Sequence, residues 1–395
     1  MTDRLREGHE NVDRNPRQCG CSCPPKCKCA CQCPHQCWCI SGCAGTCYEP
    51  SDTRIKSRSR NLVVSIDGTS NQFGPHNTNV VELHSRIVKD PEDPSKVQLT
   101  FYVSGIGTYV PPSMWSLASW KQSIANKIDL AVAWNFKKHV QDAYQWLADH
   151  YKPGDVIFLF GFSRGAYQVR ALAGMITTMG LVYSGNQRLI PFAYELYANR
   201  HKGRAIDDHK LAAELCTHFK KTFSREVRIH FIGAWDTVSS VGVFRGQPLP
   251  LTTSADHVCH FRHALALDER RVRFLPEYVR NSLSQDKELR GTIKEVWFAG
   301  THSDIGGGNR KNISLDLAGV PLLWMENEAT SAGLHLQARS DVWNWEKLKR
   351  DKPFESLKGP WWLLEKIPLT RSAYNEQDPD ETIRCKLIMR DHVHC

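Results

Sequence analysis

From residue 61 onward, short apolar runs alternate with longer amphipathic stretches. The short runs are rich in β-branched and aromatic residues and predict buried strands at 61–66, 98–103, 155–160, 227–232 and 293–298. The longer stretches carry apolar residues at helical spacing and predict helices at 124–150, 164–179, 191–200, 208–222 and 315–332. Strands that alternate with helices predict an α/β fold, with a mostly parallel sheet that helices cover on both faces.

Polar side chains suited to catalysis directly follow four of these predicted strands. They are Asp67, Ser163, Asp236 and His302. In a parallel sheet, ligands bind outside the carboxyl ends of the strands, where the loops converge. We therefore expect these four segments to meet on one rim of the sheet.

Ser163 lies in a G-x-S-x-G pattern, which runs from Gly161 to Gly165. The glycines permit the strained turn between strand and helix that exposes a nucleophilic serine, and the amide after the serine helps to form an oxyanion hole. That amide belongs to Arg164. An apolar strand leads into the pattern and a helix with small residues leads out of it, so Ser163 is the predicted nucleophile.

A serine nucleophile needs an imidazole base and an acid that orients the imidazole. Asp236 is the preferred acid and His302 the preferred base, because serine, aspartate and histidine then follow the chain order of α/β-hydrolases. Asp304 is an alternative acid, or a residue that supports the site or caps the glycine-rich turn. Three other histidines compete for the role of base: His263, His392 and His394.

The segment Asp67-Gly68-Thr69 has two interpretations. An Asp-x-Asp-Gly-Thr run would indicate a phosphatase with an aspartyl nucleophile and a divalent ion, but position 65 is a serine. We therefore expect Gly68 and Thr69 to supply oxyanion-hole backbone and Asp67 to shape the loop.

Composition divides the chain near residue 60. Residues 1–60 contain few large aliphatic residues and predict a disordered tail that ends in a basic linker, whereas residues 61–395 are the predicted catalytic domain. The tail holds 11 of the 15 cysteines, and C-x-C spacing suits zinc or copper(I). Acylation that tethers the tail to a membrane, or neither role, are the alternatives. The candidate metal ligands are Cys19, Cys21, Cys23, Cys27, Cys29, Cys31 and Cys33.

Charge and hydropathy limit the class of protein further. The net charge is +9, but 24% charged residues is an ordinary fraction, so we expect no nucleic-acid partner. No apolar run reaches the roughly 18 to 20 residues of a transmembrane helix, and no signal peptide precedes the tail. These features predict a cytoplasmic protein that contacts membranes only peripherally.

The motifs together resemble the catalytic domain of the type VI secretion phospholipase effectors, a family of α/β-hydrolases. The resemblance spans about residues 61–370 and is carried by the segments 67–71, 105–108, 161–165, 235–238, 263–271 and 300–308. It implies esterase or phospholipase A-like chemistry, with catalytic roles for Ser163, Asp236 and His302. Ser70 departs from the tryptophan that is common in the family's first motif, and the tail has no counterpart.

The sequence therefore predicts a serine hydrolase that cleaves lipid or other small carboxylic esters through an acyl-enzyme and needs no cofactor. Two aromatic stretches, 109–115 with Trp120 and 360–364, are candidates for a lid or an interfacial surface, or belong to the core. A non-catalytic scaffold, whose cysteine-rich tail binds metal or is lipidated, is the alternative function.

Overall fold

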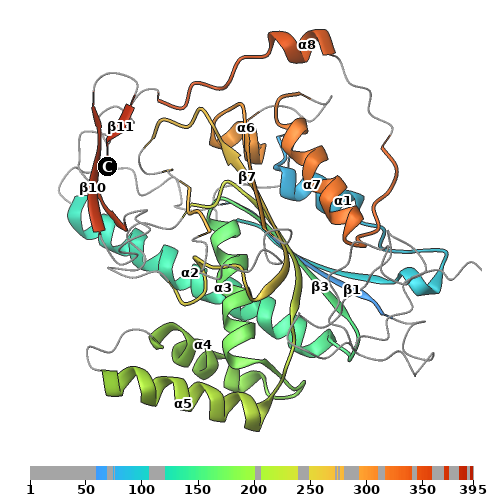
Figure 1. Ribbon diagram of the computed structural model, residues 1–395, viewed down its shortest axis with the longest axis vertical. Coiled ribbons are helices and arrows are strands. Elements are labelled where there is room, and N and C mark those ends of the chain that lie inside the picture. Colours follow the sequence, from blue (N-terminus) through green and yellow to red (C-terminus); the bar gives the residue numbers. More distant parts are fainter. Residues whose placement is uncertain are drawn as a thin grey trace, which may run out of the picture. The chain divides into compact units, whose positions relative to one another are not determined.

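A six-stranded parallel sheet forms the centre of the computed structural model, with the strand order β2-β1-β3-β6-β7-β8 (Figure 1). The structure describes residues 59–68, 74, 76–105, 121–200, 206–238, 249–271, 274, 276–279, 293–309, 316–339, 345–357, 369–372, 382–388 and 392–394. The strands of the sheet are β1 (Asn61–Ile66), β2 (Gln98–Val103), β3 (Val156–Phe162), β6 (Ile229–Trp235), β7 (Val258–Ala266) and β8 (Ile293–Phe298).

Helices connect and cover these strands. They are α1 (Asn79–Arg86), α2 (Lys121–His150), α3 (Arg164–Met179), α4 (Ile190–Asn199), α5 (Ile206–Phe223), α6 (His302–Gly306), α7 (Gly319–Ser331) and α8 (Trp345–Arg350). The described residues also include the 3₁₀ turns η1 (Pro94–Lys96) and η3 (Gln187–Leu189). The minor strands β4 (Leu181–Val182) and β5 (Ser224–Arg225) pair with each other, and β9 (Leu369–Ser372), β10 (Thr382–Ile388) and β11 (His392–His394) form an antiparallel sheet.

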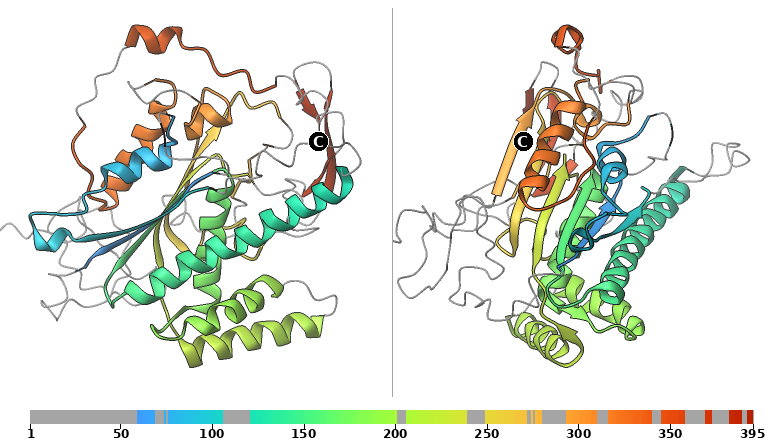
Figure 2. Two further views of the ribbon diagram at one scale, coloured as in Figure 1. Left: turned by 180° about the vertical axis from the view of Figure 1, so that it is seen from behind. Right: turned by 90° about the vertical axis from the view of Figure 1, so that its right-hand side faces the viewer.

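The strands bury side chains on both faces of the sheet. In β3, Ile157 and Leu159 belong to the core beneath α2 and α3, whereas Phe158 and Phe160 belong to the core beneath α1 and α7. Figure 2 shows these two helical layers on either side of the sheet. Because neither face of the strand meets water, a strand of this kind is apolar at nearly every position.

The α/β fold with a mostly parallel sheet between two helical layers is confirmed. The five predicted strands and five predicted helices all form, with their ends displaced by at most a few residues. The sequence interpretation did not identify β7, α1 or α6. In β7 the reason is that two polar side chains are buried in the strand: Arg262 forms an ion pair with Glu328, and His263 Nδ1 lies 2.9 Å from Glu295.

The remaining predictions concern transmembrane helices and the cysteine-rich tail. Among the described helices, none combines the length and the apolar character needed to span a bilayer. The tail cysteines lie outside the described residues, so the division at residue 60 and the metal site remain predictions.

Candidate active site

Ser163 occupies the sharp turn between β3 and α3. Its backbone has φ 57° and ψ −123°, a conformation that is costly for any residue with a side chain and that occurs in nucleophile turns. Two residues before and two residues after Ser163, only glycine fits. A Cβ on Gly165 would overlap the carbonyl oxygens of Ile66 and Asp67, the latter at 2.5 Å, and a Cβ on Gly161 would lie 2.5 Å from the carbonyl oxygen of Gly165. The glycines thus let α3 begin directly against the end of β1.

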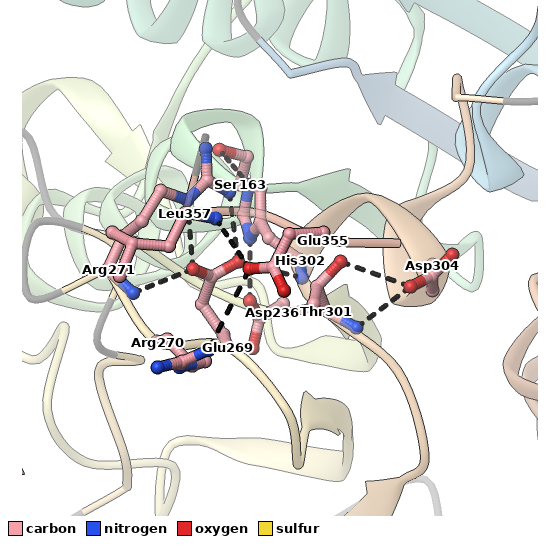
Figure 3. Close-up of polar contacts among 10 residues, drawn as sticks. All are labelled: Ser163, Asp236, Glu269, Arg270, Arg271, Thr301, His302, Asp304, Glu355 and Leu357. Carbon is pink, nitrogen blue, oxygen red and sulfur yellow. Dashed lines mark hydrogen bonds and ion pairs between the residues drawn. The ribbon is translucent and has the colours of Figure 1, made fainter. Parts of the chain in front are cut away.

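Ser163, His302 and Asp236 form one chain of hydrogen bonds (Figure 3). Ser163 Oγ lies 2.9 Å from His302 Nε2, and His302 Nδ1 lies 2.6 Å from Asp236 Oδ2. A carboxylate only accepts hydrogen bonds, so Nδ1 carries the proton and donates it to Asp236. Nε2 is then free to accept the hydroxyl proton of Ser163. This arrangement matches the geometry of a nucleophile, a general base and an orienting acid.

The backbone fixes Asp236 at the end of β6. Its amide donates to the carbonyl of Ala264 at 2.8 Å, and its Oδ1 accepts the amide of Ala266 at 3.1 Å. Asp236 is fully buried and has φ 40°, which places its carboxylate beside β7. Oδ1 thus binds the backbone, and the other carboxylate oxygen, Oδ2, binds His302.

His302 is the first residue of the short helix α6. The preceding residue Thr301 donates its amide and its hydroxyl to Asp304 Oδ2, each at 3.0 Å, which closes the start of the helix. Asp304 Oδ2 also accepts the amide of Phe354 at 2.7 Å, and Oδ1 accepts the side chain of Asn309 at 2.9 Å. Asp304 is therefore a capping residue, and the carboxylate that contacts the imidazole is that of Asp236 rather than Asp304.

Aromatic rings enclose the imidazole. The ring centroid of Phe162 lies 4.7 Å from that of His302, and the ring of Phe274 meets it edge-on at 4.9 Å. Gly306 makes the contact with Phe162 possible, because a Cβ there would overlap the phenyl ring. His302 and Ser163 are both buried, so the hydrogen bonds between them form largely out of water.

The loop after β1 departs from the expectation for Gly68. The amide of Gly68 donates to Asp67 Oδ1 at 2.6 Å and is thus not a free oxyanion donor in this structure. Asp67 Oδ2 accepts the hydroxyls of Thr78 at 2.8 Å and Tyr102 at 3.0 Å. Both oxygens of this buried carboxylate therefore hold the loop, in agreement with the loop-shaping role and unlike an aspartyl nucleophile. Thr69 lies outside the described residues.

Arg164 supplies the first amide of α3, next to the nucleophile. This amide forms no hydrogen bond with any residue that the structure describes. The first amides of a helix have no partner within the helix and carry partial positive charge, which suits a developing oxyanion. Burial lowers the pKa of the Arg164 guanidinium below its usual range.

The competing histidines occupy other places. His263 is completely buried in β7, where its Nε2 accepts the amide of Thr237 at 3.0 Å and its Nδ1 faces Glu295 at 2.9 Å. It braces the backbone that follows Asp236 and does not contact Ser163. His392 and His394 lie in β11, and their side chains are not among those described. The aromatic stretches 109–115 and 360–364 and Trp120 also lie outside the described residues.

Sequence reasoning missed one residue of this site, Glu269. Its Oε2 accepts the backbone amide of His302 at 3.1 Å. The segment 263–271 had signalled only the family resemblance, because a carboxylate that binds a backbone amide 33 residues away leaves no local pattern.

Known proteins resemble this chain over part of its length. A family model described as "T6SS, Phospholipase effector Tle1-like, catalytic domain" matches residues 60–328, more than half of the chain. The uncharacterized protein YEL023C of Saccharomyces cerevisiae is 35% identical over 223 residues, which are 55% of this chain and 32% of that protein. This chain thus spans about a third of that relative's length.

Two solved structures show distant similarity. An uncharacterized protein from Pseudomonas aeruginosa has 17% identity and a TM-score of 0.38, over 72% of this chain and 47% of that one. The Tle1 effector bound to the VgrG spike from the Type 6 secretion system has 18% identity and a TM-score of 0.34, over 64% and 52% of the two chains.

Proposed function

The chain belongs to the family of Tle1-like phospholipase effector catalytic domains, and we propose that it is a serine hydrolase that cleaves carboxylic esters of lipids through an acyl-enzyme on Ser163. The observation that carries this proposal is the continuous hydrogen-bonded chain from Ser163 through His302 to Asp236. The family supports a lipid or phospholipid ester as the substrate.

Acylation begins when His302 Nε2 removes the proton from Ser163 Oγ as that oxygen attacks the ester carbonyl. Asp236 stabilises the resulting imidazolium through its 2.6 Å contact with Nδ1. The amide of Arg164 donates to the carbonyl oxygen as it gains negative charge. His302 then gives its proton to the departing alcohol, which in a phospholipid is the lysophospholipid.

Deacylation repeats these steps with water. His302 removes a proton from the water molecule that attacks the acyl-enzyme, and then returns a proton to Ser163 Oγ. The products are a fatty acid and the free enzyme, and these steps use no cofactor. Because a lipid ester is presented at a membrane surface, this reaction needs only peripheral contact with a bilayer.

The direct test compares the full-length wild-type chain with Ser163→Ala. The assays are hydrolysis of a short-chain p-nitrophenyl ester, release of fatty acid from phosphatidylcholine vesicles, and labelling by a fluorophosphonate probe. We expect Ser163→Ala to lose the label and all but the background rate, because a triad acts as a unit. The matched control is Ser184→Ala, which changes an exposed serine whose hydroxyl contacts Asp149. We expect this variant to keep both the label and the hydrolysis rate.

Two outcomes would overturn the proposal. A wild-type protein that neither binds the probe nor cleaves either ester would support the non-catalytic scaffold. Ester hydrolysis that persists at the wild-type rate in Ser163→Ala would exclude Ser163 as the nucleophile.

A further inference from the structure

We infer that Glu269 is a positioning residue for His302, and that it acts through the backbone amide of His302 and, with Arg271 and Phe274, through the imidazole ring. This inference rests on the proposed function, since it concerns the base of the same reaction. Glu269 lies in the loop after β7. In the sheet, β7 lies between β6, which precedes Asp236, and β8, which precedes His302.

Glu269 binds the start of α6 directly. Its Oε2 accepts the amide of His302 at 3.1 Å (Figure 3). This amide is the first of α6 and has no partner inside the helix, so the carboxylate satisfies a donor that burial would otherwise leave unpaired. The contact holds the backbone from which the imidazole projects.

Arg271 fixes the orientation of Glu269. Glu269 Oε1 accepts both the amide and the Nε of Arg271 at 2.8 Å, and Oε2 accepts Arg271 Nη2 at 2.9 Å. The carboxylate side chain is only 2% exposed and that of Arg271 is 10% exposed. A two-pronged contact of this kind defines the direction of a carboxylate as well as its place.

Arg271 also acts on the imidazole of His302 indirectly, through the ring of Phe274. Its guanidinium carbon lies 3.6 Å from the ring centroid of Phe274, which is a close cation–π contact. The ring of Phe274 in turn meets the ring of His302 edge-on, with centroids 4.9 Å apart. Glu269, Arg271 and Phe274 therefore hold both the backbone and the ring of His302.

The ion pair also acts electrostatically. Burial by itself would raise the pKa of Glu269, but hydrogen bonds and the charge of Arg271, together with the charge of His302, hold that pKa below its ordinary value. Glu269 thus stays negative while His302 becomes positive during the reaction. Around His302 the charged groups are Asp236 after β6, Glu269 and Arg271 after β7, and Asp304 on α6 itself.

Two neighbouring arginines provide a matched comparison. Arg271 is buried against Glu269, whereas Arg270 is 40% exposed and its ion pair with Glu355 spans 3.9 Å. An exposed pair of that length contributes little. Glu328 provides a comparison for Glu269, because it is an ion-paired carboxylate that binds Arg262 and Lys294 on β7 and β8.

The experiment measures kcat, KM and the pH–rate profile of ester hydrolysis for full-length Glu269→Gln and Arg271→Gln, with Arg270→Gln and Glu328→Gln as controls. We expect the first two to lower kcat roughly 10- to 100-fold, with KM within about twofold, because a displaced base slows the chemical step. The controls stay within about twofold of wild type in kcat.

The pH profile distinguishes positioning from a loss of stability. Removal of the negative charge of Glu269 disfavours the imidazolium form of His302, so the acid limb of the profile for Glu269→Gln moves to lower pH by roughly 0.5 to 1 unit. Partial unfolding would lower the active fraction at every pH and leave the limb in place. If Glu269→Gln does not fold, Glu269→Asp and Phe274→Leu test the same contacts with smaller changes.

The outcomes separate this inference from the proposed function. An active wild-type enzyme whose Glu269→Gln variant keeps its kcat and its acid limb overturns the inference and leaves the function intact. A folded Glu269→Asp variant with wild-type kcat overturns it equally. A wild-type protein that fails the Ser163 test overturns the proposed function itself.

Discussion

The amide of Ser163 donates a hydrogen bond to the carbonyl of Trp235 at 3.0 Å, so the sheet itself joins the candidate nucleophile to the residue that precedes Asp236. A second contact, from the amide of Val238 to the carbonyl of Ser163 at 3.3 Å, closes the other side. The serine and the acid thus hold their separation through backbone contacts of adjacent strands. Only His302 depends on a more distant segment.

Asp236→Asn is expected to leave the fold intact and to lower kcat on the order of 10⁴-fold. The asparagine oxygen can still accept the amide of Ala266, but its amide group would face His302 Nδ1 and favour the tautomer that protonates Nε2. Steady-state hydrolysis of the p-nitrophenyl ester measures the loss, and thermal unfolding checks the fold. A loss below tenfold in a folded variant would argue against Asp236 as the acid.

Asp304→Asn tests the role of the other aspartate. Because Asp304 caps α6 and binds the amide of Phe354, we expect a loss of roughly 0.5 to 2 kcal/mol in the free energy of unfolding and a fall in kcat far smaller than that of Asp236→Asn. Denaturant unfolding and ester hydrolysis measure the two effects. Equal losses of kcat in the two asparagine variants would contradict this assignment.

Gly165→Ala is expected to destabilise the protein by roughly 1 to 3 kcal/mol or more. The new Cβ would overlap the backbone carbonyls of Ile66 and Asp67, which cannot rotate away as a flexible side chain can. Thr177→Ala, a less tightly packed position on the same helix, is the control and changes stability little. Denaturant unfolding monitored by circular dichroism gives both values, and an unchanged midpoint for Gly165→Ala would refute the close approach.

Three partly buried histidines predict a loss of stability in acid. The pKa values of His84, His257 and His260 are lowered from 6.5 to about 4, and burial is the largest cause of each shift. Between these values the unfolded chain binds protons that the folded chain does not, so the free energy of unfolding falls as the pH drops from about 6.5 to about 4.

His257→Leu should make this fall smaller, because leucine has no group that titrates. The substitution breaks no hydrogen bond of the ring, since neither ring nitrogen of His257 has a partner among the described residues. His218→Leu, on the exposed face of α5, should leave the pH dependence as it is. Urea unfolding at pH 7, 6, 5 and 4 measures the slope. Identical slopes for His257→Leu and wild type would contradict the effect of burial on this histidine.

The sequence predicts best the elements whose environment is uniform. Strand β3 is apolar along its length and β1 is mostly apolar because both faces are buried, and α3 follows from the small residues after Ser163. β7 could not be predicted in this way, because the carboxylates that bind the buried side chains of Arg262 and His263 come from α7 and β8. A five-residue helix such as α6 is too short to produce a periodic pattern.

The sequence could likewise identify some residues of the candidate site and not others. Ser163, Asp236 and His302 could be proposed together because each follows a predicted strand, and the structure brings the three into contact. The bond that occupies the amide of Gly68 and the cap formed by Asp304 depend on local geometry that residue types alone do not define. Glu269 could not be identified, since its contact with His302 is to the backbone amide and not to the side chain.

The position of His302 in the chain also matters during synthesis of the protein. The ribosome completes the turn at Ser163 and the strand before Asp236 well before it reaches α6, and the amide that completes the cap of Asp304 belongs to Phe354. Until translation passes these residues, the hydrogen bond between Ser163 and His302 cannot form. A chain that ends before α6 therefore holds Ser163 without the hydrogen bond to His302 Nε2, so the proposed nucleophile is completed only by a late segment of the domain.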